Sequence, residues 1–194
     1  MIELKDLSIG YGHRELVSDA GAIFAPASLT ALAGRNGSGK STLLRAIAGL
    51  GKISAGEIII DGKTRFASAV ERARSIAFVN TQRVRIANMK CRDLVGLGRA
   101  PYTDWAGRLG RRDREIVEAA LDTVGMSAYA DRTLDTMSDG ECQRIMIARA
   151  LAQDTPNILL DEPTSFLDLP NRYQLMELLG TLAHDRGKTI LLST

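Results

Sequence analysis

The chain has 194 residues, 45% of them hydrophobic and 25% charged, with 25 Lys and Arg set against 23 Asp and Glu. This length is enough for one domain with a real hydrophobic core, and the near-neutral charge argues against bulk electrostatic binding of nucleic acid or a membrane surface. No apolar run is long enough to span a bilayer, the N-terminus has no secretory-signal pattern, and Cys91 and Cys142 match no metal or disulfide spacing. We therefore expect a soluble protein of a reducing cytosol.

Strand and helix patterns alternate over the first 80 residues. Alternating apolar residues indicate a half-buried strand or strand pair that starts at Ile2 and ends near Tyr11. A glycine-rich loop separates the next strand from the first helix. The further elements expected here are a strand over 29–33, a helix over 41–50, a strand over 56–60 closed by an Asp-Gly turn, and a strand over 75–80.

The middle of the chain differs in character from both ends. Residues 84–150 read as mostly helical, with an amphipathic stripe over 113–124. Strand patterns return at 158–160 and 190–193, with a helix around 175–182 between them. Strand–helix alternation on both sides of a helical insert predicts an α/β core that carries a helical subdomain.

A phosphate-binding motif lies between the strand over 29–33 and the following helix. Its pattern is G-x-x-x-x-G-K-S, in the strand–loop–helix context that the motif requires. Backbone N–H groups of such a loop form an anion nest, and the helix adds its partially positive N-terminus. We expect Lys40 to reach the β- and γ-phosphates and the Ser41 hydroxyl to ligate Mg²⁺. A purely structural glycine-rich turn is the alternative. The residues expected to bind nucleotide here are Gly34, Asn36, Gly37, Ser38, Gly39, Lys40, Ser41 and Thr42.

Two adjacent carboxylates, Asp161 and Glu162, follow the apolar residues 158–160. Ligands of open parallel sheets bind at the carboxyl ends of the strands, which is where this pair is expected. Asp161 is the natural oxygen ligand for Mg²⁺, directly or through water. Glu162 is then free to orient and deprotonate an attacking water. The alternative is that the Asp-Glu-Pro-Thr sequence serves only as a turn or helix cap.

With these motifs in place, the sequence resembles the ATP-binding subunits of ABC transporters along essentially its whole length. Gln82 is similar to the glutamine of the family's Q-loop, which contacts Mg²⁺ or its water and links to the membrane partner. Asp168 ends a segment similar to the D-loop, and Tyr11 is placed like the aromatic residue that stacks on adenine. The resemblance implies a P-loop NTPase (RecA-like) core with an antiparallel β portion and an inserted helical subdomain. The expected boundaries are 1–83 and 151–194 for the nucleotide-binding core and 84–150 for the helical signature subdomain.

Residues 137–141 (Met-Ser-Asp-Gly-Glu) are similar to the family's signature loop, which closes on the γ-phosphate held by a second chain. The resemblance therefore makes Ser138 and Gly140 nucleotide contacts. From the residues alone, Ser138 and Glu141 predict a capping box, and a capped helix N-terminus also suits phosphate. Asp139 and Glu141 depart from the family's commoner glycine and glutamine, and both add negative charge near the expected triphosphate.

Plainer interpretations stay open for several of these residues. For Tyr11 the plainer interpretation is that it covers a strand end, and for Gln82 that it is an ordinary polar loop residue. Asp168, with Pro170 after it, would also start the following helix. Cys142 has no neighbouring cysteine in the sequence, so an inert thiol is expected rather than a redox role.

The resemblance implies an ATPase that binds ATP and Mg²⁺, with Glu162, Gln82 and Lys40 in catalysis and Ser41, Gln82 and Asp161 at the metal. Two such subunits would form a homodimer. They would lie as peripheral subunits on the cytoplasmic face of the inner (plasma) membrane, and be soluble when isolated. Their partners would be transmembrane permease subunits and, through them, a substrate-binding protein, with no nucleic acid expected.

The cargo is suggested by the resemblance alone. A Gly-Arg-x-Pro segment within 95–102 is similar to that of importers for iron-siderophore complexes, haem and cobalamin. Pro101 is expected to end a helix there. Tyr102 and Trp105 would either form an apolar docking surface or only pack the subdomain.

Two alternative functions remain to be distinguished from a transporter ATPase. A soluble ABC ATPase that acts on nucleic acid or ribosomes would have a long insertion or two cassettes, whereas only about 55 residues separate Gln82 from Ser138. The other is a nucleotide-binding fragment without turnover. The family's switch histidine follows the strand that ends this chain. Neither His13 nor His184 takes its place, and His184 is expected in the connection before that strand. A chain cut short before this histidine is expected to bind ATP and to hydrolyse it poorly.

Overall fold

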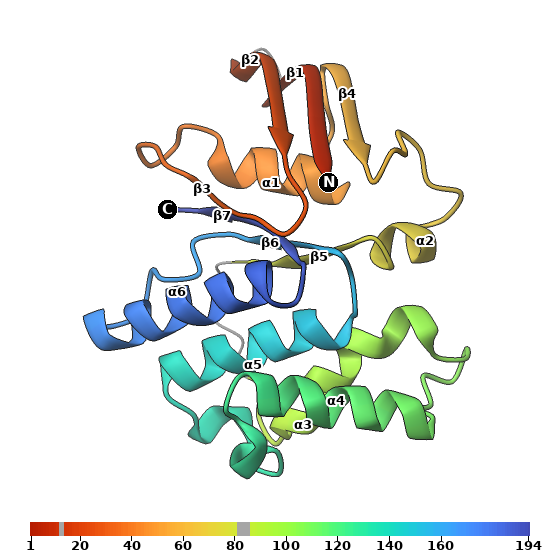
Figure 1. Cartoon of the computed structure of the whole chain (residues 1–194), viewed down its shortest axis with the longest axis vertical. Helices are drawn as coiled ribbons and strands as arrows, with labels where there is room; N and C mark the ends of the chain where they lie inside the picture. The colour runs from red at the N-terminus through yellow and green to blue at the C-terminus, as the bar shows by residue number, and fades with distance from the viewer. Residues whose placement is uncertain (12–13, 81–85) are drawn as a thin grey trace.

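Two separate β-sheets organise the chain, with helices between and below them (Figure 1). The computed structural model describes residues 1–11, 14–80 and 86–194. An antiparallel sheet forms the upper layer in Figure 1, a parallel sheet the middle layer, and a group of helices the lower layer. This is the α/β arrangement with an antiparallel portion and a helical insert that the sequence predicts.

The antiparallel sheet has the strand order β2-β1-β4. Its strands are β1 (Ile2–Tyr11), β2 (Arg14–Phe24) and β4 (Ala55–Ile60). Of the strand or strand pair expected within the first 11 residues, the structure has the single strand, β1. It pairs with both β2 and β4, and β2 has no counterpart among the predicted strands. Register shifts interrupt the β1–β2 pairing, and Asp6 and Asp19 adopt positive φ angles of 47° and 46°. These irregularities break the alternation by which strands are recognised.

The parallel sheet has the order β3-β7-β6-β5, and each of its four strands is among those that the sequence predicts. They are β3 (Leu29–Leu32), β5 (Ile76–Val79), β6 (Asn157–Leu160) and β7 (Thr189–Ser193). Alternate side chains face opposite ways: Leu159 and Leu191 pack with β1 and α1, whereas Ile158 and Ile190 pack with the helices below. Both faces of the sheet are therefore covered, and its carboxyl edge remains for ligands.

The helices divide between the two sides of this sheet. Helix α1 (Lys40–Ala48) lies between the sheets, and α6 (Leu169–His184) covers the other face of the parallel sheet. His184, expected in the connection before β7, is instead the last residue of α6, and it is exposed. The remaining helical elements are α2 (Ala69–Ala73), α3 (Cys91–Gly96), η1 (Leu97–Tyr102), α4 (Arg111–Thr123), η2 (Ser127–Tyr129), η3 (Leu134–Thr136) and α5 (Asp139–Ala152).

The Gly-Arg-x-Pro segment joins η1 to the end of α5. A Cβ atom on Gly98 would lie 2.2 Å from the carbonyl oxygen of Arg149, so only glycine permits this approach. Arg99 is 4% exposed, pairs with Asp113 at 2.9 Å and donates to the carbonyl of Ala152 at 2.8 Å. This segment therefore fixes the packing of three helical elements.

The two aromatic residues after this segment behave differently. The guanidinium groups of Arg99 and Arg74 lie 3.9 and 4.9 Å from the centroid of the Tyr102 ring. Trp105, in contrast, is 98% exposed. Of the two interpretations left open, packing applies to Tyr102, whereas Trp105 stands at the surface.

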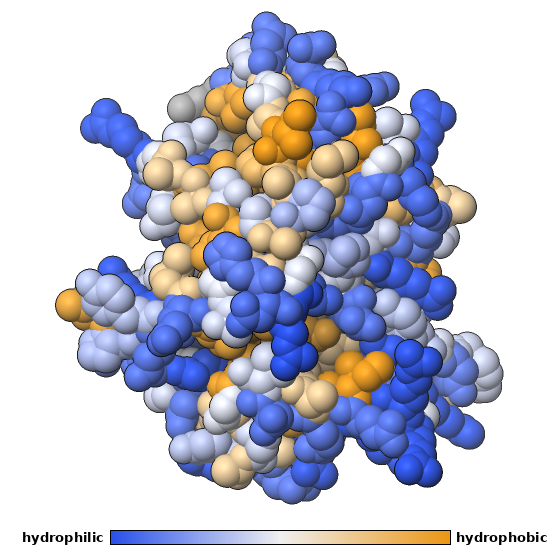
Figure 2. Space-filling view, viewed as in Figure 1, coloured by the Kyte–Doolittle hydropathy of each residue, from blue (hydrophilic) through white to orange (hydrophobic). Residues whose placement is uncertain are grey.

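The surface follows the same layers. On the face seen in Figure 2, hydrophobic residues gather over the upper half, which holds the antiparallel sheet and α1, and the helices of the lower half show mostly hydrophilic residues. Within the described ranges, no helix combines the length and the hydropathy that crossing a membrane demands. Cys91 and Cys142 are not joined in a disulfide.

Candidate functional site

The glycine-rich loop links the carboxyl end of β3 to the start of α1. Gly37 and Gly39 have φ angles of 79° and 95°, a region that side chains disfavour. Gly39 is the N-cap of α1 and has no side chain with which to cap it, so the first backbone N–H groups of the helix are open to an anion. The Lys40 ammonium donates to the carbonyl oxygens of Gly34 at 2.5 Å and Arg35 at 3.2 Å. The cation is thus held at the loop, where phosphate oxygens can replace these carbonyls.

The loop meets the acidic pair through two hydroxyl groups. Ser41 Oγ and Ser193 Oγ each donate to Asp161 Oδ1 at 2.8 Å, and Ser193 Oγ accepts from the backbone N–H of Glu162 at 2.8 Å. Asp161 is 4% exposed. The structure therefore brings Ser41, Asp161 and Glu162 together at the carboxyl edge of the sheet. Ser193 is not among the residues predicted for the site, although it is a polar residue that follows three apolar residues at the end of β7.

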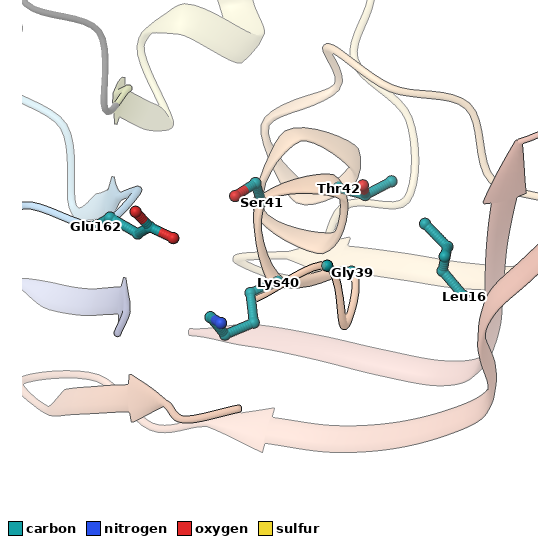
Figure 3. Close-up of a pocket in the computed structure, with 7 residues that line it drawn as sticks. Leu16, Gly39, Lys40, Ser41, Thr42 and Glu162 are labelled. Atoms are coloured by element: carbon teal, nitrogen blue, oxygen red, sulfur yellow. The ribbon is translucent and has the colours of Figure 1, made fainter. Parts of the chain in front are cut away.

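Glu162 faces the glycine-rich loop across a pocket of about 370 Å³. In Figure 3 its carboxylate points toward the side of the loop that carries Lys40 and Ser41, and Leu16 lies on the opposite side. The backbone of Glu162 is left-handed, with φ 45°, and its carbonyl accepts from Ser165 Oγ at 2.8 Å. Turn chemistry and a pocket-facing carboxylate thus coexist here. The pocket is lined by Leu16, Gly37, Gly39, Lys40, Ser41, Thr42 and Glu162.

The oxygen atoms in this cluster suit the coordination of a magnesium ion that is bound together with phosphates. A serine hydroxyl and an aspartate oxygen lie 2.8 Å apart, and both are hard oxygen ligands of the kind Mg²⁺ takes. Within the described part of the chain, no group of three or more His, Cys, Asp or Glu residues could hold a metal by itself. The oxygens of phosphate and water are hard ligands of the same kind.

The N-terminus of α5 carries the predicted capping box. Glu141 N–H donates to Ser138 Oγ at 3.3 Å, and Glu141 Oε2 accepts from both Ser138 N–H and Ser138 Oγ at 2.8 Å. The hydrogen bond from Ser138 N–H contributes most, and the one from Ser138 Oγ next, to holding the pKa of Glu141 below its ordinary value. The Ser138 hydroxyl is therefore directed to a carboxylate of its own helix.

Asp168 and Gly140 lie on either side of Asn171. Asp168 is the N-cap of α6 and accepts from the backbone and side-chain nitrogens of Asn171 at 3.1 and 2.7 Å. A Cβ atom on Gly140 would lie 3.3 Å from the Asn171 side chain. The helix-start interpretation of Asp168 is thus correct. The structure joins this pair and Ser138 in one region, and none of the three lines the pocket beside Lys40. The N-terminal ends of α1, α5 and α6 nevertheless point to the same side of the molecule (left in Figure 1).

Two predicted residues remain untested by this geometry. Gln82 lies outside the described residues. Tyr11 closes β1 and pairs with Arg14 through the backbone, and its side chain lies outside the description as well. Their assigned roles stay predictions.

Comparison with known proteins identifies the family. The model of the ABC transporter family matches residues 18–165. The chain belongs to the ABC transporter family. Within it, the chain is 36% identical to the iron(3+)-hydroxamate import ATP-binding protein FhuC of Bacillus subtilis, over 98% of this chain and 71% of that protein. It is also 36% identical to the petrobactin import ATP-binding protein FpuC of Bacillus anthracis, over 99% and 71%.

Solved structures of ABC cassettes share the whole fold. A dimeric, post-hydrolysis structure of the ATP-binding cassette MJ0796 bound to ADP and Pi superimposes with a TM-score of 0.84 and 28% identity, covering 100% of this chain and 88% of that one. The predicted P-loop NTPase architecture is thereby confirmed. The ATP-binding subunits of this family are ATPases.

Proposed function

We propose that this chain is the ATP-binding and hydrolysing subunit of an ABC importer for an iron–siderophore complex. The observation that carries the proposal is the cluster of Ser41, Asp161 and Glu162 beside the glycine-rich loop and Lys40. The cargo follows from the relatives, whose names specify iron-hydroxamate and petrobactin import. These names favour an iron chelate over haem or cobalamin.

In this proposal MgATP occupies the pocket with its phosphates on the loop of residues 34–42. Lys40 leaves the carbonyls of Gly34 and Arg35 and binds phosphate oxygens, while the N-terminus of α1 donates backbone N–H groups. Ser41 and Asp161 hold Mg²⁺, which when bound screens the phosphate charge and orients the γ-phosphate.

Glu162 acts as the general base. Its carboxylate accepts a proton from a water molecule as the water oxygen bonds to the γ-phosphorus. The bond from the γ-phosphorus to the β–γ bridging oxygen breaks, and ADP and phosphate result. The pocket-facing position of this carboxylate, across from Lys40, supports the assignment.

The complete site needs a second copy of the chain. We propose a two-fold, head-to-tail dimer in which Ser138 and Gly140 of each copy contact the other's nucleotide and Asp168 lies at the interface. The common direction of the N-termini of α1, α5 and α6 supports this arrangement, as does the dimeric cassette of known structure.

The permease would dock on the side that carries α2 and η1, placing the dimer at the cytoplasmic face of the plasma membrane as a peripheral subunit. Arg74, after α2, donates to the Pro101 carbonyl at 2.7 Å, so this side is continuous from the core to the helical elements. Large hydrophobic residues exposed on α2, after α1 and after η1 are Leu50, Ile53, Val70 and Trp105. Gln82 and the subdomain over 84–150 would transmit closure to the permease, and a substrate-binding protein would deliver the chelate.

The test compares Glu162→Gln with Glu177→Gln, which changes an exposed glutamate of α6. In the assembled importer, Glu162→Gln is expected to lower phosphate release at least about 100-fold and to trap an ATP-bound dimer on size exclusion. Glu177→Gln is expected to leave both unchanged. Hydrolysis that persists in Glu162→Gln refutes the role of this carboxylate as the base.

A further inference from the structure

Resting on the proposed nucleotide site, we propose that Ser193 is a positioning residue that fixes both members of the Asp161–Glu162 pair. Ser193 is the last residue of β7, and it is 0% exposed. The strand residues before it, Ile190, Leu191 and Leu192, are apolar core residues. A hydroxyl at this depth persists only when it is hydrogen-bonded, so its partners indicate its purpose.

The hydroxyl of Ser193 makes a hydrogen bond to each member of the acidic pair, as donor in one and as acceptor in the other. It donates to Asp161 Oδ1 at 2.8 Å and accepts from the backbone N–H of Glu162 at 2.8 Å. Its backbone, in contrast, takes part in the ordinary pairing of the sheet, opposite Leu32. The side chain therefore contributes to the site, and the main chain contributes to the fold.

Glu162 needs this support because its backbone is strained. A φ angle of 45° is left-handed, and a residue with a side chain holds it only when its surroundings fix it. The hydrogen bond from Glu162 N–H to Ser193 Oγ fixes the peptide on one side, and the bond from Ser165 Oγ to the Glu162 carbonyl fixes it on the other. Together they set the direction in which the Glu162 carboxylate enters the pocket.

Asp161 needs the hydrogen bond from Ser193 because the Ser41 hydroxyl must leave Asp161 to bind a metal ion. Asp161 Oδ1 accepts from two hydroxyls, Ser41 and Ser193. When the Ser41 oxygen turns to a metal ion, the bond from Ser193 still holds the carboxylate in orientation. Ser193 thus prepares the carboxylate for Mg²⁺ without touching the ion, and partners of this kind change metal affinity by about 10- to 100-fold when removed.

The variants are chosen to separate this role from simple loss of a buried hydroxyl. Ser193→Ala removes both hydrogen bonds, and Ser193→Thr keeps the hydroxyl. Thr155→Val is the matched control, because Thr155 is 1% exposed, donates to the Asn157 carbonyl at 2.8 Å, and lies just before the amino end of β6, whereas the acidic pair follows its carboxyl end. Ser193→Cys, which keeps the volume with a weak donor, replaces Ser193→Ala if the alanine variant does not fold.

The measurement is binding of a non-hydrolysable ATP analogue to the chain, titrated with Mg²⁺. Ser193→Ala is expected to weaken the apparent Mg²⁺ affinity about tenfold and to leave metal-free nucleotide binding unchanged. Ser193→Thr and Thr155→Val should match wild type. In the assembled importer, Ser193→Ala should lower kcat about tenfold at saturating Mg²⁺, with KM for ATP within about twofold.

The outcomes separate the two proposals. If wild type binds the nucleotide with Mg²⁺ and Ser193→Ala matches it, the positioning role is overturned and the nucleotide site stands. An equal loss in Ser193→Ala and Thr155→Val also overturns the positioning role. If wild type binds no nucleotide, the proposed function fails, and this inference fails with it.

Discussion

Replacing Arg99 by alanine should destabilise the chain far more than replacing an arginine at the surface. The Arg99 guanidinium pairs with Asp113 at 2.9 Å, donates to the Ala152 carbonyl at 2.8 Å and lies 3.9 Å from the Tyr102 ring centroid. The side chains of the ion pair are 5% and 16% exposed. Removing one partner of a buried pair costs about 3–5 kcal/mol, because the other is left without compensation.

The assay is the free energy of unfolding from urea titration, with Arg111→Ala as the control. Arg111 pairs with Glu115 at 2.9 Å in an i,i+4 pair whose side chains are 94% and 61% exposed, a type of pair worth about 0.3–0.5 kcal/mol. Arg99→Ala should therefore lower the free energy of unfolding by at least about 2 kcal/mol more than Arg111→Ala does. This difference corresponds to a Tm that is lower by about 4–8 °C. Equal losses in the two variants would refute the structural role of Arg99.

The Arg99–Asp113 pair also makes the stability of the fold depend on pH in a defined direction. Burial acts to raise the pKa of Asp113, but the hydrogen bonds from Arg99 and from Gly110 N–H outweigh it, so the pKa lies below 3.8. A lowered carboxylate pKa stabilises the fold above the unfolded value, and this contribution is lost as the pH falls through the folded value. The difference between wild type and Arg99→Ala should therefore shrink below about pH 4. A difference that grows on acidification would contradict this assignment.

Three further results are expected. Gly98→Ala should lower the unfolding free energy by about 1–3 kcal/mol in urea titration, because a Cβ atom would lie 2.2 Å from the Arg149 carbonyl; an unchanged midpoint would contradict this packing. The pKa of Glu141 lies below 4.5, so its helix cap is fully present above that pH and lost as the pH falls through the lowered value, which carbon-13 NMR of the carboxylate can follow. Asp139→Gly with Glu141→Gln removes two negative charges at the start of α5 and should strengthen ATP-dependent dimerisation in light scattering; weaker dimers would show that these carboxylates assist closure.

The parts of the site that were predictable lie close together along the chain. A phosphate nest, a strand-end carboxylate pair and a helix cap are local structures, so a few consecutive residues are enough to predict them. They are the loop around Lys40, the Asp161–Glu162 pair and the Ser138–Glu141 capping box. The meeting of the loop and the Asp161–Glu162 pair at one sheet edge followed from the expected parallel order.

What could not be predicted depends on contacts between distant residues. Ser193 reads as part of a buried strand until the fold places it against Asp161, 32 residues away in sequence. Arg99 reads as a motif residue until α4 and α5 supply Asp113 and Ala152 as its partners. Strand β2 was missed because bulges interrupt its alternation, which is a property of its pairing with β1.

The proposed function requires that the pocket beside Lys40 binds MgATP. Calorimetric titration of the purified chain with ATP and Mg²⁺ measures this binding. We expect one nucleotide per chain, and a loss of affinity of about 100-fold or more in Lys40→Ala, whose ammonium lies at the mouth of the loop. Absence of binding in the wild-type chain, or equal affinity in Lys40→Ala, would contradict the account.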